Sequence, residues 1–295
     1  MIKRFVLPII ANLLLALPPL FWLISAGQNT RHEALPVLTQ YLKFLYARDF
    51  RQAYRFISAE DRRLKSANDY VRERQPFTGF ALDVARKLAG LIEIRPLSAE
   101  PDGARSRVTV SMKLPDANGI ARLLLDWDDK RLNALSSDER KNMLSTIDGL
   151  ISANKLPMIE GQEQFILVKE GSTWKIFLDW AAGSQLQFAT TPPTGGEIAA
   201  EPITKATVVR SGDPFTIGFK VKNRTAKEVV TRIVHRVEPQ ELTPYLDLVE
   251  CALLLPVRMR PSEEQIFHST YVVRGDLPEG TKSIHVTYDF QIENQ

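Results

Sequence analysis

The side chains that could support chemistry are few in this chain of 295 residues. It has one cysteine, Cys251, and four histidines, His32, His235, His268 and His285. One cysteine excludes an internal disulfide framework and a closed thiolate cage within a single chain. The sequence contains no glycine-rich phosphate loop, no paired-cysteine zinc spacing and no residues that form a nucleophilic triad. These features predict a protein that is not an enzyme.

Acid–base catalysis would need paired carboxylates, and Asp126, Asp128 and Asp129 form one acidic cluster. A carboxylate pair can act as acid and base when the pKa of one member is raised. Three acids within four residues, followed by Lys130 and Arg131, are more typical of a solvated turn. We therefore assign no catalytic residue.

The composition limits the class of protein. It is 44% hydrophobic and 25% charged, close to the average of soluble globular proteins. The excess of 38 basic over 35 acidic residues is too small to indicate a nucleic-acid partner. At roughly 150 residues per domain, the length predicts about two domains.

The N-terminus has the pattern of a membrane signal. Lys3 and Arg4 precede an uncharged, mainly apolar stretch at positions 5–29, and a spanning helix needs about 20 such residues. Ser25-Ala26-Gly27 resembles a cleavage site, and a removed signal peptide is the alternative. We favour a transmembrane anchor over residues 1–30, because the apolar region of a signal peptide is only about 7–15 residues long. The positive residues should stay in the cytoplasm, which places the rest of the chain outside it.

Residues 31–189 have the pattern of helices followed by strands. Apolar residues spaced by three or four predict helices at 35–49, 50–57, 67–74, 80–91 and 138–154. Ser58 and Asp61 fit a capping box that opens another short helix, and Asp49 can cap the helix after it. Alternating residues predict strands at 91–94, 105–114, 120–127, 164–169 and 173–180, with a turn at 115–119 making a hairpin of the second and third.

This order of elements is similar to the cone-shaped nuclear-transport-factor-like (SnoaL-like) domains. The resemblance is carried by the run at 41–54 and by Gly171-Ser172-Thr173-Trp174-Lys175-Ile176. It implies an α+β cone whose pocket could bind a small ligand or support an enzyme activity. Since this fold serves many functions, the resemblance alone assigns none.

The last third of the chain is rich in predicted strands. A stretch rich in Pro, Gly and Thr predicts a linker at 190–202. Beyond it, strands are predicted at 215–223, 229–237, 252–257, 266–273 and 283–290. Short strands without intervening helices predict a β-sandwich over 203–295.

Several residues of this sandwich resemble the copper chaperones that assemble cytochrome c oxidase, the CtaG type. The matching positions are Asn223, Pro239, Pro244, Tyr245, Cys251, Pro261, Glu263 and 287–290. The resemblance implies an immunoglobulin-like domain, exported behind one membrane span of the bacterial inner membrane, with the N-terminus cytoplasmic and the bulk of the chain periplasmic. The predicted fold class is thus a transmembrane helix, an α+β cone and an all-β sandwich.

The chain departs from that family at its copper motif. The Cys-Phe-Cys-Phe positions read Cys251-Ala252-Leu253-Leu254, and Ser262 replaces a glycine. Copper(I) prefers soft ligands, usually at least two. A copper(I) site at Cys251 would need Met259, the cysteine of a second copy in a homodimer, or a partner's thiol. The alternative is that Cys251 is a small buried apolar residue.

Other polar residues of the sandwich have structural as well as functional interpretations. The strand pattern places His235 inward or at an edge, and it places His268 and His285 as neighbours on one exposed face. Such a histidine pair can bind metal, although exposed cross-strand pairs are common. Arg258 and Arg260 flank Met259 in a loop and could hold an acidic partner.

We therefore predict a membrane-anchored periplasmic factor for a copper-dependent respiratory (cytochrome c) oxidase. It would assist assembly or stabilisation by contact with an oxidase subunit or its assembly machinery. One alternative is a copper(I) chaperone that shares Cys251 across a dimer. Another is ligand binding or enzyme activity in the cone pocket.

Overall fold

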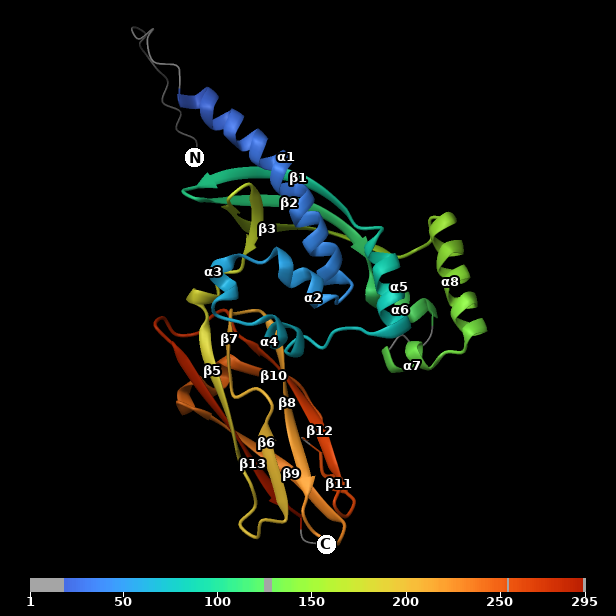
Figure 1. The fold of residues 1–295 in the computed structure, drawn as a ribbon, viewed down its shortest axis with the longest axis vertical. Coiled ribbons are helices and arrows are strands. Elements are labelled where there is room, and N and C mark those ends of the chain that lie inside the picture. The colour runs from blue at the N-terminus through green and yellow to red at the C-terminus, as the bar shows by residue number, and fades with distance from the viewer. Residues whose placement is uncertain (1–18, 125–128, 254, 294–295) are drawn as a thin grey trace, which may run out of the picture.

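A computed structural model describes residues 19–124, 129–253 and 255–293 (Figure 1). Its first part, residues 19–124 and 129–182, mixes helices with one sheet (Figure 1). Its second part, residues 184–253 and 255–293, is made of two sheets. The mixed α+β architecture predicted from the sequence is confirmed at this level. The cone and immunoglobulin-like types remain predictions.

The described chain begins with helices that alternate with short turns. They are α1 (Pro19–Tyr46), α2 (Phe50–Ala53), η1 (Tyr54–Phe56), α3 (Ala59–Arg62), α4 (Ala67–Arg72) and α5 (Gly79–Ala89). Ser58 caps α3 as predicted, because its Oγ accepts a hydrogen bond from the backbone N of Asp61. The predicted cap at Asp49 is wrong. The Asp49 side chain makes no cap bond and instead pairs with Arg86 of α5 at 2.5 Å.

The first sheet is antiparallel and has the order β1 (Glu93–Asp102), β2 (Arg105–Pro115), β3 (Met158–Glu170), β4 (Thr173–Phe177). α1 lies across this sheet (Figure 1). Leu38 and Tyr41 of the helix share a core with Val108 and Ile176 of the strands. This burial supplies the apolar stabilisation of the first part. The hairpin of β3 and β4 confirms the hairpin predicted for 164–180, except that β4 ends at Phe177 and residues 178–180 are not in a strand.

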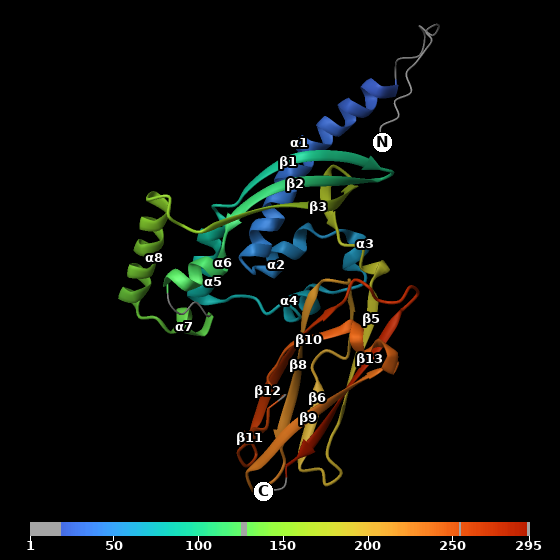
Figure 2. The same cartoon turned by 180° about the vertical axis from the view of Figure 1, so that it is seen from behind.

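Residues 120–124 belong to a helix, and their predicted strand is wrong. β2 pairs with β1 and β3, while α6 (Ala117–Leu124), α7 (Asp129–Ala134) and α8 (Ser137–Ser152) lie together at one side (Figure 1, Figure 2). Ile120, Leu132 and Ile147 of these helices pack against α5. Burial of Ile120 on one face of α6 outweighs the Asn-Gly turn signal at 118–119 that predicted a hairpin. Asp126 and Asp128 lie outside the described residues, and Asp129 is exposed.

Two sheets pack face to face in the second part. One has the order β10 (Leu246–Cys251), β12 (Glu264–Val273), β8 (Pro214–Asn223), β6 (Ile198–Pro202). The other has the order β11 (Val257–Met259), β9 (Val229–Glu238), β13 (Ser283–Ile292), β5 (Ser184–Thr191), β7 (Ala206–Val209). Short helices η2 (Trp180–Ala182) and η3 (Gln240–Tyr245) flank them. Inward residues of both sheets, such as Phe219 and Tyr288, form one core.

Two predictions on this part differ from the structure. The region 190–202, predicted as a linker, contains the end of β5 and all of β6, which pairs with β8. The prediction of one strand at 252–257 is wrong, since β10 ends at Cys251, residues 252–253 and 255–256 belong to no strand, and β11 begins at Val257 in the other sheet. In both cases backbone pairing with strands distant in sequence decided the outcome. The domain boundaries otherwise remain a prediction.

Most of the predicted membrane anchor, residues 1–18, lies outside the described residues. Within residues 19–124, 129–253 and 255–293, no helix combines the length and apolarity needed to cross a membrane. The anchor remains a prediction from the sequence.

Ser262 is expected to carry backbone strain. Its φ is 60°, in the left-handed region that costs a residue with a side chain about 1 kcal/mol. Ser262→Gly should therefore raise the free energy of unfolding by about that amount in urea denaturation. Gly103 has a φ of +61° with open space around it, and Gly103→Ser is the matched control that should lose a similar amount. A Ser262→Gly variant less stable than the unmodified chain would contradict this interpretation.

Candidate functional site

Cys251 ends β10, the edge strand of its sheet. The thiol is half-buried, and its Sγ lies 3.1 Å from Oγ of Ser269, the residue opposite in the strand register. It also packs against the sandwich core. The surroundings of Cys251 agree with the structural alternative of a small packed residue.

Two buried tyrosine hydroxyls lie near Ser269 and Cys251. Tyr271 and Tyr288 hydrogen-bond through their hydroxyls, and the His235 ring lies 6.4 Å and 6.2 Å from theirs. Burial raises the pKa of both phenols and lowers the pKa of His235. All three groups are therefore neutral near pH 7, which suits a hydrogen-bonded core better than a proton-transfer site.

The positions of the copper motif do not assemble a two-thiolate or thiol–thioether site within the described chain. Leu253, at the second cysteine position, is fully buried in the core. Met259 is also fully buried, on β11 at the edge of the other sheet. No group of three or more His, Cys, Asp or Glu suited to a metal ion occurs in the described ranges. The residues that the structure describes therefore do not fit copper(I) held by one protomer alone.

The histidine pair predicted on one sheet face is wrong. His268 is exposed on β12, whereas His285 is exposed on β13 of the other sheet. The alternation in each strand was interpreted correctly, but the assignment of strands to sheets depends on pairings that the alternation does not encode.

Asn223, Arg258 and Arg260 lie around the end of β11. Asn223 is fully buried, and its Nδ2 donates to the carbonyls of Lys227, Met259 and Arg260 at 2.8–3.2 Å. Arg258 is exposed and pairs with Glu228 at 3.0 Å. The predicted loop placement is wrong for Arg258, which lies on β11 and pairs with Val230 of β9. Asn223 thus fixes the end of β11, from which the exposed Arg258 and Arg260 side chains extend.

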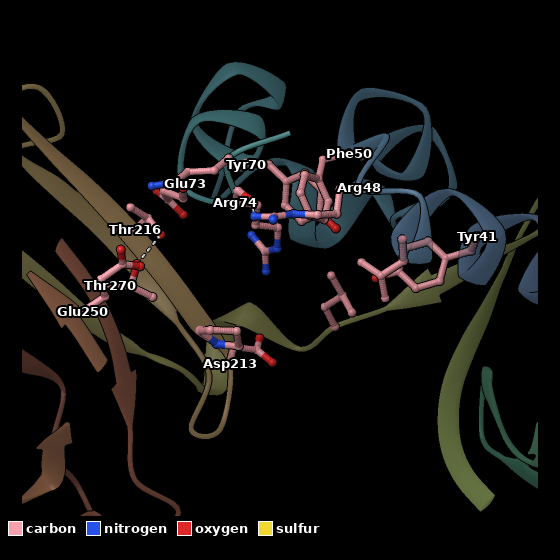
Figure 3. A pocket seen from close by; sticks show the side chains of 14 residues that line it. Tyr41, Arg48, Phe50, Tyr70, Glu73, Arg74, Asp213, Thr216, Glu250 and Thr270 are labelled. Carbon is pink, nitrogen blue, oxygen red and sulfur yellow. Dashed lines mark hydrogen bonds between the residues drawn. The ribbon is translucent and has the colours of Figure 1, made fainter. Parts of the chain in front are cut away.

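A cleft between the two parts was not predicted from the sequence. It has a volume of about 560 Å³ and is walled by both parts of the chain (Figure 3). The first part contributes Tyr41, Leu45, Arg48, Phe50, Tyr70, Glu73, Arg74, Gln75 and Leu178, and the second contributes Asp213, Pro214, Thr216, Glu250 and Thr270. Pockets of this size at domain boundaries are common ligand sites.

A buried ion pair supports one wall of the cleft. Lys65 Nζ lies 2.6 Å from Glu73 Oε2, and the two side chains are 3% and 0% exposed. The Lys65 ammonium also lies 5.0 Å from the ring centre of Trp180. The Glu73 carbonyl accepts a 2.7 Å hydrogen bond from Thr216 N of β8. The segment around α4 therefore joins both parts.

Charged groups of opposite sign face each other across the cleft. Arg48 Nη2 donates to the carbonyl of Arg74 at 3.0 Å, and the Arg74 guanidinium lies 4.1 Å from the ring centre of Tyr70. Burial raises the pKa of Asp213 on the other wall, and the positive charges of Arg74, Lys65 and Arg210 partly oppose that rise. The arrangement can bind a polar group between a basic and an acidic wall.

No sequence motif signals this site. The pattern at 67–74 predicts only a helical turn, and a lysine and a glutamate eight positions apart give no sign of burial. Only their distance and burial in the folded chain identify them.

Comparison with known proteins gives one family. Residues 164–291 match the model of the cytochrome c oxidase assembly protein CtaG/Cox11 family, an assembly family to which only this part of the chain is assigned. No curated protein matches. Among solved structures, "Escherichia coli alpha-2-macroglobulin activated by porcine elastase" is 10% identical with a TM-score of 0.22, over 68% of this chain and 22% of that chain. The chain therefore spans about a fifth of that structure.

Lys65→Met should strongly destabilise the protein. It leaves the fully buried Glu73 without its partner, and such a loss costs about 3–5 kcal/mol. Urea denaturation measures the change. The double variant Lys65→Met with Glu73→Gln removes the uncompensated charge and should recover much of the loss. Equal stability of Lys65→Met and the unmodified chain would contradict the ion pair's role.

Asp213 should make stability depend on pH. Its folded-state pKa is raised above the ordinary value of 3.8, which means that its ionisation costs stability as the pH rises through the folded pKa. Asp213→Asn should therefore be more stable than the unmodified chain at pH 7, and this gain should disappear near pH 3. Denaturation at both pH values measures it, and a gain that is larger at pH 3 has the wrong sign.

Proposed function

We propose that this protein assists the assembly or stabilisation of a copper-dependent cytochrome c oxidase by protein contact. The observation that carries the proposal is the match of residues 164–291 to the CtaG/Cox11 oxidase assembly family. That stretch contains nearly all of the sandwich, from β5 to β13. The partner is then an oxidase subunit or another member of its assembly machinery.

The residues at the copper-motif positions favour a role by protein contact over copper(I) transfer. A transfer site needs a thiolate that can reach a second soft ligand. Here the half-buried Cys251 thiol packs on the core beside Ser269, and Leu253 fills the second position. These contacts make Cys251 a part of the packing.

Exposed residues on β10 and on the segment after it support a partner site. Val249 and Leu255 are large apolar residues with 64% and 77% of their surface exposed. Arg258 and Arg260 follow on the same segment and are also exposed. Exposed aliphatic side chains beside arginines suit a protein partner that offers apolar and acidic residues.

An anchor at residues 1–30 would place this surface in the periplasm of a bacterial inner membrane. The support is the uncharged stretch at 5–29 behind Lys3 and Arg4. Anchoring would confine the protein to the membrane in which a respiratory oxidase is assembled.

Co-purification tests the contact. Tagged full-length protein should retain oxidase subunits, and its deletion should lower the oxidase level. Leu255→Asp combined with Arg258→Glu should reduce retention at least fivefold, because it inverts a charge and removes an apolar contact. Lys141→Glu, on the exposed face of α8, is the control that should retain them. Absence of oxidase subunits together with an unchanged oxidase level in the deletion strain would reject the proposal.

Copper(I) titration tests the alternative of a shared cysteine. In competition with a copper(I) chelator, the reduced full-length chain should bind less than one copper(I) per two chains. Cys251→Ser should give the same result. Tight binding of one copper(I) per two chains that disappears in Cys251→Ser would instead support a dimeric copper(I) chaperone.

A further inference from the structure

Two adjacent residues on the wall of the cleft have unsatisfied buried atoms. Among the described residues, Glu73 Oε1 and Arg74 Nη1 are buried and have no hydrogen-bond partner. Glu73 is fully buried, and its other oxygen, Oε2, is held by Lys65. An unpaired buried acceptor and an unpaired buried donor each cost free energy, which a bound ligand can recover.

A ligand that satisfies both atoms must offer one hydrogen-bond donor and one hydrogen-bond acceptor. Glu73 Oε1 can only accept a hydrogen bond while ionised, and Arg74 Nη1 can only donate one. A peptide residue in extended conformation presents its N–H and its own carbonyl oxygen on the same side, and the N–H suits Glu73 while the carbonyl oxygen suits Arg74. Both atoms lie beneath the cleft surface, and binding therefore requires the half-buried Arg74 side chain to turn toward the ligand.

The charges around the cleft favour a neutral ligand. Three cations, Arg48, Lys65 and Arg74, stand against three carboxylates. The carboxylates are Glu73, Asp213 and Glu250. Arg210, whose charge also acts on Asp213, is itself paired with Asp179 and leaves this balance unchanged. Figure 3 shows Arg74 extending toward the space above Asp213. Because the formal charges balance, a ligand with a net charge would leave one charge without compensation.

Aromatic side chains supply the rest of the wall. Tyr41, Phe50 and Tyr70 line the cleft on the side of the first part (Figure 3). The rings of Phe50 and Tyr70 pack edge to face at 6.1 Å. Such a wall gives apolar contact area to an aromatic or large aliphatic group.

We propose that the cleft between the two parts binds a peptide group that carries an apolar side chain. The N–H of one residue pairs with Glu73 and its carbonyl with Arg74, and the side chain of that residue packs on the aromatic wall. Such a group can come from a free small amide or from an exposed segment of a protein. The proposal concerns this cleft alone and stands apart from the role in oxidase assembly.

Calorimetric titration of the full-length chain with three probes tests it. N-acetylphenylalaninamide has both features and should bind saturably. 3-Phenyl-1-propanol keeps the aromatic group without the amide. The N-acetylphenylalanine anion adds a negative charge. Both should bind at least fivefold more weakly than the first probe. No saturable binding of the first probe, or equal binding of all three, would overturn the proposal.

An N-acetylated tripeptide amide with central phenylalanine separates the two sources of the ligand. Tighter binding than that of N-acetylphenylalaninamide indicates a peptide segment, and equal binding indicates a small amide.

Two variants locate the site. Arg74→Met keeps the length of the side chain but removes the donor, and it should weaken the amide probe at least fivefold without affecting 3-phenyl-1-propanol. Arg51→Met, at an exposed arginine that bonds Asn68 outside the cleft, is the matched control and should change neither. Undiminished amide binding in a folded Arg74→Met variant would overturn the proposal. The probe comparison on the unmodified chain decides the matter even when Arg74→Met does not fold.

Discussion

The buried pair of Lys65 and Glu73 is the interaction on which the arrangement of the two parts depends. Removing both charges from water is costly, and the cost is offset only by close geometry and further hydrogen bonds. The pair has the close geometry, with a 2.6 Å contact and the Trp180 ring beside the ammonium, whereas Glu73 Oε1 is left without a hydrogen-bond partner. Since the Glu73 carbonyl also accepts from Thr216 N, the same residue fixes the first part to β8 of the sandwich.

This constraint explains why the polar site lies between the parts and not inside either one. The cores of both parts are filled by apolar side chains. The charges of Arg74 and Asp213 meet where the two surfaces do not close completely. Arg72 Nε adds a hydrogen bond to Thr204 Oγ1 at 2.9 Å, and Arg210 Nη1 pairs with Asp179 at 3.0 Å. These contacts also join the two parts.

The resemblance to oxidase assembly proteins is carried by residues that shape the sandwich. Asn223 holds a loop through three carbonyls, and Ser262 occupies a left-handed position that glycine fills more easily. A fold of this kind can be retained when a metal ligand is exchanged for an apolar residue, because Leu253 packs in the core. Fold and copper chemistry therefore need separate evidence in this chain.

The sequence by itself determined the elements whose signals are local. The Ser58 cap, the helix near 138–152, the hairpin of β3 and β4 and the alternation in β8 follow from near neighbours along the chain. Only the tertiary structure decided that 117–124 is helical, that His268 and His285 lie in different sheets, and that Lys65 is buried beside Glu73. The reason is physical. Burial and strand pairing depend on partners far away in sequence, and one chain's local pattern does not specify which distant residues it will meet.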